Sequence, residues 1–189
     1  MMHQVVCGKL AKTEFMVGLL CAMAHVTGKD KDMAVKGQIA EVMWMAESLR
    51  AFKFMAEEQA HADQRGTFMP LRRPIDTSRN LFRTMYPRMV EIVQMLGSSS
   101  LMATPSEADF SNELSGDVGQ YFQTVNADSR DRIALFRLAH DVAVSGFGSR
   151  QTLYERFFFG PPPIMAAGYF DLYNKDDMMD RVTALLNDA

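Results

Sequence analysis

The chain has 189 residues, of which 48% are hydrophobic and 23% are charged. This composition is typical of an ordinary globular domain and excludes disordered, collagen-like and coiled-coil chains. The 20 basic and 23 acidic residues give a formal charge of −3, which is too balanced for a protein that binds nucleic acid or an anionic membrane. A chain of this length buries about 70% of the surface of its unfolded form, so its core needs no metal or disulfide.

Cys7 and Cys21 are the only cysteines. On one helix they would lie roughly 21 Å apart along the axis, so we expect reduced thiols and a cytoplasmic protein. Two lysines precede the apolar run 15–24, which ends in Ala-Met-Ala and partly resembles a signal peptide. Helical spacing begins before this run, however, and the run is shorter than the roughly 20 residues that span a membrane. We therefore expect no membrane segment.

Helical spacing of apolar residues predicts the first two elements. The first helix covers residues 3–27 and ends before Gly28, and the second covers 30–65 and ends before Gly66. A glycine just past the last apolar turn commonly ends a helix, because it readily takes the left-handed conformation. The segment 69–74 holds two prolines, which lack the amide donor that a helix needs, and is predicted to be a connector.

A third helix is predicted between Asp76, which is placed to cap it, and Leu96, with a kink at Pro87. The periodicity is then lost over residues 97–116. Within this segment, Thr-Pro-Ser-Glu at 104–107 has the spacing of a capping box with proline in the first helical position, so at least one helical turn is expected there. Loops of this length inside a compact domain are usually functional.

Three further helices are predicted after this loop. A short one covers residues 118–124, and a long one is capped by Asn126 and ends at Gly160, before the triple proline 161–163. The last is an amphipathic helix over residues 176–186.

No segment alternates apolar and polar residues over the length of a strand, and no hairpin dipeptide lies between such segments. We therefore predict an all-α chain. Residues 1–160 are expected to form a helical bundle domain with four main helices, and residues 161–189 an extended C-terminal tail with a short helix.

Glu58 and His61 form a Glu-x-x-His step, which would place both side chains on one helical face as half of a di-metal ligand set. None of His3, His25 and His140 follows a glutamate by three residues, so the second half is missing and no metal site is expected. The sequence also lacks the serine elbow of hydrolases, a catalytic cysteine signature and the glycine motifs of phosphate-binding loops.

Residues 145–152 are unusual because Gly146 and Gly148 fall in the middle of the long predicted helix, at a cost of roughly 1 kcal/mol each. Glycine allows the close approach of a flat ligand or of another helix. The side chains that follow can bind phosphate, ribose or an aromatic ring system: Ser149, Arg150, Gln151 and Thr152. The alternative is tight helix packing, with Arg150 paired to a carboxylate.

Five motifs follow one another along the chain: Tyr-Pro-Arg at 86–88, Leu-Met-Ala-Thr-Pro-Ser-Glu-Ala-Asp at 101–109, Leu-Phe-Arg-Leu-Ala-His-Asp at 135–141, Phe-Gly-Ser-Arg-Gln at 147–151 and Tyr-Glu-Arg-Phe-Phe-Phe-Gly at 154–160. In this order they resemble the C-terminal domain of the 4-hydroxyphenylacetate 3-monooxygenase oxygenase-component family, over about residues 3–186. That family includes chlorophenol monooxygenases and the pyoverdine-chromophore hydroxylase, so the resemblance does not fix the substrate.

The resemblance implies a fold similar to acyl-CoA dehydrogenases, in which an N-terminal helical domain, a central β-domain and a C-terminal four-helix bundle enclose a flavin. Only the last of these three is expected in this chain. In the family, reduced FAD arrives from a separate reductase, reacts with oxygen and hydroxylates a phenol ortho to its hydroxyl group. The residues that hold the phenol come mainly from the other two domains, so the chain alone is expected to be inactive.

The resemblance also assigns residues. It matches Gly148, Ser149, Arg150, Gln151 and Thr152 to the part of the family's C-terminal domain that contacts FAD. Gln94 and residues 97–100 resemble the step by which such bundles contact the flavin of a neighbouring subunit, although serines stand at 98–100 where glycines are usual. The prolines at 161–163 also replace a charged sequence of the family.

Two functional hypotheses follow. The first is the C-terminal, flavin-contacting and oligomer-forming part of a two-component aromatic hydroxylase, with FAD as cofactor and a flavin reductase as partner. It would form a homodimer or homotetramer, as a separate subunit beside a chain with the missing domains or as a fragment. The second is a helical association module without a catalytic role.

Overall fold

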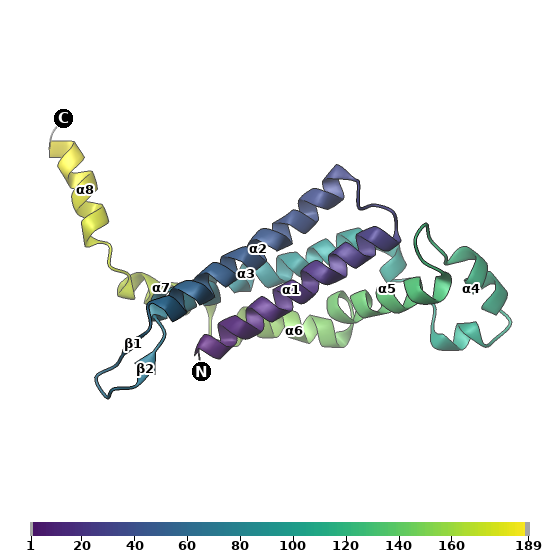
Figure 1. Cartoon of the computed structure of the whole chain (residues 1–189), viewed down its shortest axis with the longest axis horizontal. Helices are drawn as coiled ribbons and strands as arrows, with labels where there is room; N and C mark the ends of the chain where they lie inside the picture. The colour runs from purple at the N-terminus through teal and green to yellow at the C-terminus, as the bar shows by residue number, and fades with distance from the viewer. Residues whose placement is uncertain (1, 188–189) are drawn as a thin grey trace.

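Three long helices, α1 (Met2–Val26), α2 (Met33–Glu58) and α3 (Arg72–Gly97), lie side by side and form the body of the molecule (Figure 1). The computed structural model describes residues 2–187. The largest side chains in its core are apolar and come from these three helices: Met16, Leu20, Met23, Leu49, Phe82 and Met89. Burying one such side chain contributes roughly 1.5–3 kcal/mol, so this shared core holds the three helices together.

The helix predicted over residues 3–27 is confirmed, and α2 begins a little later than expected. Asp32 caps α2, because its Oδ1 accepts hydrogen bonds from the backbone amides of Ala34 (2.8 Å) and Val35 (3.1 Å). A short acidic side chain in this position satisfies amides that have no partner within the helix. This cap therefore fixes the residue at which α2 begins.

The second helix ends at Glu58 and not at Arg65, because a small hairpin follows it. The strands β1 (His61–Ala62) and β2 (Phe68–Met69) pair antiparallel, with His61 opposite Met69. In the turn, Asp63 Oδ1 accepts from the amides of Arg65 and Thr67, and Gly66 has a φ of +78°. The helix predicted up to residue 65 is therefore too long, and the sequence analysis did not foresee the hairpin. Strands of two residues are too short to show an alternation of apolar and polar residues. The Asp63 carboxylate accepts hydrogen bonds from backbone amides that would otherwise bond within a helix.

The third helix begins at Arg72, before the predicted cap. Pro74 lies in its first turn, where the missing amide has no helical partner to lose. Asp76 is therefore not the N-cap but an internal residue, and its carboxylate pairs with Arg72 (2.9 Å) and Arg79 (2.7 Å). The helix continues through Pro87.

The segment after α3 is ordered by short helices: η1 (Ser98–Leu101), η2 (Glu107–Phe110) and α4 (Ser115–Tyr121). The expected helical turn is present, but the capping box joins Ser106 to Asp109 and not Thr104 to Glu107. The Asp109 carboxylate accepts from the Ser106 amide, which holds the pKa of this carboxyl below its usual range.

The single long helix predicted up to Gly160 is in fact two helices, α5 (Ser129–Ala143) and α6 (Gly146–Phe157). Asp128 caps α5, whereas the predicted cap, Asn126, donates from Nδ2 to the His25 carbonyl (2.7 Å) and so ties this loop to the end of α1. Both helices pack on α3.

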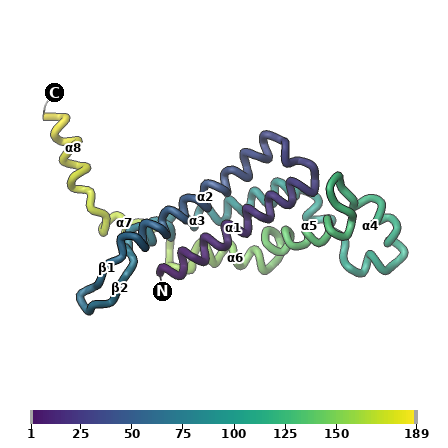
Figure 2. The backbone as a smooth tube through the Cα atoms, viewed as in Figure 1, coloured from purple at the N-terminus to yellow at the C-terminus, as the bar shows by residue number. Residues whose placement is uncertain are grey.

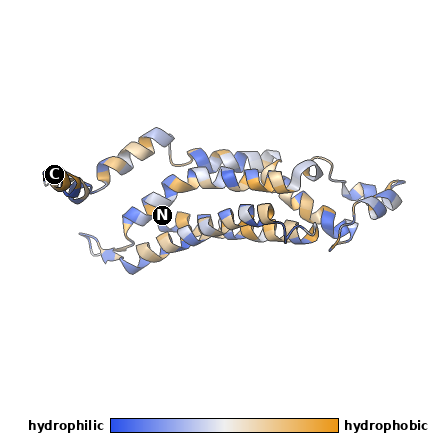
Figure 3. Ribbon diagram, turned by 90° about the horizontal axis from the view of Figure 1, so that it is seen from above, coloured by the Kyte–Doolittle hydropathy of each residue, from blue (hydrophilic) through white to orange (hydrophobic). Residues whose placement is uncertain are grey.

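Two more helices complete the chain, α7 (Pro162–Leu172) and α8 (Asp176–Asn187). Gly160, with a φ of +112°, turns the chain before α7, which packs on α3. The tube view shows α8 projecting away from the bundle (Figure 2). Apolar residues recur along the helices of the bundle (Figure 3), and the all-α prediction is confirmed apart from the hairpin. None of the helices within residues 2–187 is both long and apolar enough to cross a membrane.

We predict that Asp32→Ala lowers the free energy of unfolding by about 1 kcal/mol, because the amides of Ala34 and Val35 lose their acceptor. Urea denaturation followed by circular dichroism measures this change. Asp30→Ala is the matched control, since Asp30 lies two residues earlier and caps no helix. Equal stability of the two variants would contradict the assigned cap.

Candidate functional site

The junction between α5 and α6 is built by Ser145. Its hydroxyl donates to the Asp141 carbonyl (2.7 Å) and accepts from the Gly148 amide (3.2 Å), so one side chain ends α5 and caps α6. Serine is among the preferred residues for this position. Gly146 and Gly148 therefore lie in the first turn of a new helix, and the expected cost of glycines in mid-helix does not arise.

Gly148 is buried where α6 crosses the last turn of α5. A Cβ atom added to Gly148 would lie 2.3 Å from the Val142 carbonyl oxygen and 2.7 Å from that of Asp141. No side chain fits at such distances, so glycine is required by the packing of the two helices. Gly146, by contrast, has open space where its Cβ would be.

Gln94 joins α3 to the same junction. Its Nε2 donates to the carbonyl of Ala143, the last residue of α5, at 2.7 Å. The structure thus brings together the two segments that the family resemblance assigns to flavin contacts, one in α3 and one at the start of α6. In the three serines at 98–100, which follow α3, the Ser100 hydroxyl accepts a hydrogen bond from Arg132 of α5 (3.1 Å), and Ser98 has a positive φ of 48°.

The five predicted site residues have different environments. Gly148 is buried, whereas the side chains of Ser149 and Arg150 are exposed and make no hydrogen bond or ion pair with other residues in 2–187. Gln151 donates to Glu155 (2.9 Å), and Thr152 donates to the Gly148 carbonyl (3.0 Å). Tight helix packing at the glycine is therefore confirmed, but the alternative in which Arg150 pairs with a carboxylate is wrong for the described residues.

The exposed face of α6 presents three chemically distinct groups. Phe147, Arg150 and Tyr154 follow one another at helical spacing, and all three are exposed. We call these three residues the α6 face. A phenyl ring, a guanidinium and a phenol in line can stack on a flat ring system and bind a phosphate or a carboxylate.

A buried carboxylate lies on the inner side of α6. Glu155 is 4% exposed and accepts hydrogen bonds from Lys9 Nζ (3.0 Å), from Lys12 Nζ and from Gln151. Lys9 is 3% exposed, and its ammonium lies 4.0 Å from the centre of the Phe82 ring. The network joins α1 to α6 and holds Gln151, one turn before Glu155. The sequence analysis missed this cluster.

Burial and charge shift the pKa values around this carboxylate. Burial lowers the pKa of Lys9 below its usual value of 10.5, and the negative charge of Glu155 opposes this shift. Burial also raises the pKa of Tyr86 to about 12, with a smaller contribution in the same direction from Glu155. Tyr86 is therefore neutral at neutral pH, as expected for a phenol in the core.

The Glu-x-x-His step does not lie on one helical face, because Glu58 is the last residue of α2 and His61 belongs to β1. Within residues 2–187, no group of three or more histidine, cysteine, aspartate or glutamate side chains is arranged to hold a metal ion.

Comparison with known proteins shows the family to which the chain belongs. The model of the family described as 4-hydroxyphenylacetate 3-hydroxylase C terminal matches residues 1–187. The chain belongs to this family. It is 42% identical to the 4-hydroxyphenylacetate 3-monooxygenase oxygenase component of Thermus thermophilus and 40% identical to that of a Geobacillus species, over its whole length. It spans only 39% and 38% of these relatives, respectively.

Solved structures agree with this membership. The oxygenase component HpaB of 4-hydroxyphenylacetate 3-monooxygenase, complexed with FAD, matches 99% of the chain with a TM-score of 0.96 and 42% identity, and the chain covers 40% of it. A 4-hydroxybutyryl-CoA dehydratase from N. maritimus matches with a TM-score of 0.83 but only 15% identity, and so shows the fold alone. The fold is the C-terminal helical bundle of acyl-CoA dehydrogenase-like proteins, as the family resemblance implied.

We predict that Gly148→Ala lowers the free energy of unfolding by about 1–3 kcal/mol, because the new methyl group forces α6 away from the Val142 carbonyl. Gly146→Ala is the matched control. It has room for the methyl group, and its stability should be unchanged or raised by up to about 1 kcal/mol. Thermal and urea unfolding measure both, and a Gly148→Ala variant as stable as Gly146→Ala would contradict the packing described.

We predict that Glu155→Gln lowers the free energy of unfolding by about 3 kcal/mol at neutral pH, because Lys9 keeps a buried charge without its counter-charge. The change also lowers the pKa of Lys9 further below 10.5, because Glu155 raises it in the native protein. Between this lowered pKa and 10.5, Lys9 is protonated in the unfolded variant but neutral in the folded one. The unfolded state then binds more protons, so the free energy of unfolding of the variant should rise with pH over this range.

Urea unfolding at about pH 7 and about pH 9.5 tests this pH dependence. The control is the double variant Lys9→Met with Glu155→Met, which removes both charges and should be more stable than Glu155→Gln at neutral pH. A Glu155→Gln variant that matches the native stability at both pH values would show that the pair does not hold α6 on α1.

Proposed function

We propose that this chain is the C-terminal, flavin-contacting and oligomer-forming part of a two-component, FADH2-dependent phenol ortho-hydroxylase of the 4-hydroxyphenylacetate 3-monooxygenase type. A separate flavin reductase supplies the reduced FAD. The protein works in the cytoplasm, in keeping with its two free thiols, Cys7 and Cys21.

The observation that carries this proposal is the α6 face beside the α5–α6 junction. Arg150 has no carboxylate partner within residues 2–187, so its guanidinium is available to a ligand. The relative whose backbone matches with a TM-score of 0.96 was solved in complex with FAD. An unpaired guanidinium between two aromatic side chains suits a ligand that has both a flat ring system and phosphates.

The residues fit a flavin in different ways. Ser149 and Arg150 offer a hydroxyl and a guanidinium directly, whereas Gln151 has its amide nitrogen on Glu155 and presents its oxygen as an acceptor. Gly148 and Thr152 hold the shape of the turn through close packing and the Thr152 hydrogen bond to the Gly148 carbonyl. When bound, reduced flavin would supply the activation of oxygen.

We propose further that the chain does not turn over a substrate alone. The α6 face is open to solvent, with Phe147 71% exposed, whereas hydroxylation by activated oxygen needs a site that excludes water. The walls of such a site would come from the rest of the enzyme, since this chain covers only 39% and 38% of the length of the two relatives named above. The chain's contribution would be to bind and orient the cofactor.

A helical association module without a catalytic role is the second candidate. It is favoured by α8, whose apolar side chains, such as Leu185 and Leu186, are more than 70% exposed. Large exposed apolar surfaces of this kind are typical of protein contacts. This candidate predicts an oligomer that is indifferent to changes at Gly148 and Arg150.

We predict that the purified chain binds FAD, oxidised or reduced, near one per chain, and that Arg150→Ala weakens binding roughly 10- to 100-fold, because a charge-assisted hydrogen bond is lost. An anaerobic titration followed by flavin fluorescence and absorbance measures this. Arg156→Ala is the matched control, since Arg156 lies on the same helix but away from the α6 face, and should change binding less than about twofold. A folded chain that binds no FAD would favour the association module.

A further inference from the structure

Two ammonium groups of α1 share one buried carboxylate of α6. Lys9 Nζ donates to Oε2 of Glu155 at 3.0 Å, and Lys12 Nζ donates to Oε1 of the same carboxylate. Two positive charges and one negative charge leave a net charge of +1 on these three groups. Lys9 is 3% exposed and lies within the core, whereas the Lys12 side chain is 40% exposed. The positive charge that Glu155 does not neutralise therefore reaches solvent at Lys12.

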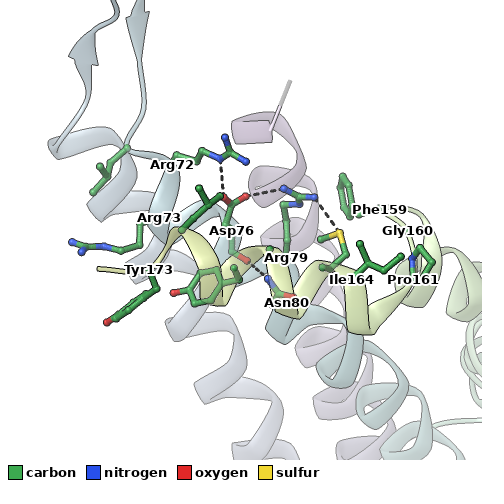
Figure 4. Close-up of a pocket in the computed structure, with 15 residues that line it drawn as sticks. Arg72, Arg73, Asp76, Arg79, Asn80, Phe159, Gly160, Pro161, Ile164 and Tyr173 are labelled. Atoms are coloured by element: carbon green, nitrogen blue, oxygen red, sulfur yellow. Dashed lines mark hydrogen bonds and ion pairs between the residues drawn. The ribbon is translucent and has the colours of Figure 1, made fainter. Parts of the chain in front are cut away.

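A second carboxylate near these lysines, that of Asp76 on α3, is already neutralised. It pairs with two guanidinium groups, including that of Arg79 at 2.7 Å. Figure 4 shows Arg79 between Asp76 and the Phe159 ring, whose centre lies 4.3 Å from the guanidinium. The centre of the same ring lies 5.6 Å from the ammonium of Lys9. Arg79 is therefore buried and occupied and cannot receive a ligand, unlike Lys12.

Lys12 lies beside the α6 face. Its ammonium is 5.5 Å from the centre of the Tyr154 ring, which is within the range of a cation–π contact. The carboxylate oxygen that accepts from Lys12, Oε1 of Glu155, also accepts from Nε2 of Gln151 at 2.9 Å. The ammonium and the amide therefore meet at one atom, and Gln151 belongs to the predicted cofactor segment 148–152. A residue of α1 thus adds a positive charge to the edge of a site that was assigned to α6.

We propose that Lys12 is a further cofactor-binding residue and that it holds the diphosphate of FAD together with Arg150. The inference rests on the proposed function and adds a residue that the family resemblance did not assign. An ammonium has three N–H donors, and Lys12 uses one of them on Glu155, which leaves two for phosphate oxygens. Arg150 supplies a planar set of donors one turn before Tyr154. Each phosphate of the diphosphate carries a negative charge, and the two cations match these charges.

The roles of the two lysines can be separated by substitution. Lys9 alone neutralises Glu155, so removal of the Lys12 ammonium leaves the contact between α1 and α6 in place. Lys12→Met keeps an apolar stem beside Tyr154 and removes the charge. Lys12→Arg keeps the charge and can donate to a carboxylate and a phosphate at once. A loss of binding in Lys12→Met that Lys12→Arg restores therefore reports on the charge and not on the fold.

Titration of the purified chain with FAD and with riboflavin, followed by flavin fluorescence, tests the proposal, because riboflavin has the same ring system but no phosphate. Lys12→Met should weaken FAD binding about 5- to 20-fold, and Lys12→Arg should bind within about threefold of the native chain. Riboflavin should bind the native chain and Lys12→Met equally. Raising the salt concentration should weaken FAD binding to the native chain more steeply than to Lys12→Met.

Lys53→Met is the matched control, because Lys53 also pairs with a carboxylate, that of Glu57 at 2.8 Å, and is 33% exposed, but lies on α2. It should change FAD binding less than about twofold. Circular dichroism checks that the three variants remain helical.

The outcomes separate this inference from the proposed function. If the native chain binds FAD and Lys12→Met binds it as tightly as Lys53→Met, the flavin site stands but Lys12 is not part of it. If Lys12→Met loses as much affinity for riboflavin as for FAD, its effect does not act through the phosphates and the proposal fails. A folded native chain that binds no FAD would overturn both.

Discussion

The structure depends on one buried carboxylate, that of Glu155. It receives two lysines from α1 and the amide of Gln151 from its own helix, and so fixes α6 on the first helix of the bundle. Lys9 remains in the core only because this partner and the Phe82 ring are present, since an isolated buried ammonium is costly. The outward side of α6, with Arg150 and its aromatic neighbours, therefore stands on a rigid base. A rigid support is what a cofactor contact requires.

The fold class and the main helices follow from the sequence because apolar spacing dominates long helices, and the family resemblance supplied the parent fold. What the sequence did not reveal is where short-range hydrogen bonds override that spacing. Val144 and Ser145 continue the apolar and polar pattern, yet the Ser145 hydroxyl takes over the role of the helical bonds and starts a new helix. At the hairpin, the Asp63 carboxylate accepts hydrogen bonds from the amides of Arg65 and Thr67 and so forms a turn where the apolar spacing predicted helix.

The candidate site was predictable in part. The segment 148–152 was identified from its glycine and from the family resemblance. That Ser149 and Arg150 are exposed, while the side chains of Gln151 and Thr152 make hydrogen bonds, could not be predicted because it depends on how α6 packs. Lys9 and Glu155 are 146 residues apart, and nothing in either local sequence indicates their pairing. One signal was present: Lys9 falls among the apolar positions of a helix that is otherwise buried there. The α6 face lies on a helix from the second half of the chain that packs on α3.

Gly148 changes how other members of this family should be compared. Its contact with the Val142 carbonyl leaves no room for a side chain whether or not a cofactor is bound. Selection for folding alone would preserve this glycine, even in a descendant that had lost its flavin. The glycine therefore cannot serve as a marker of activity when sequences are sorted. The residue at position 150, which the bundle itself does not need, is the informative one.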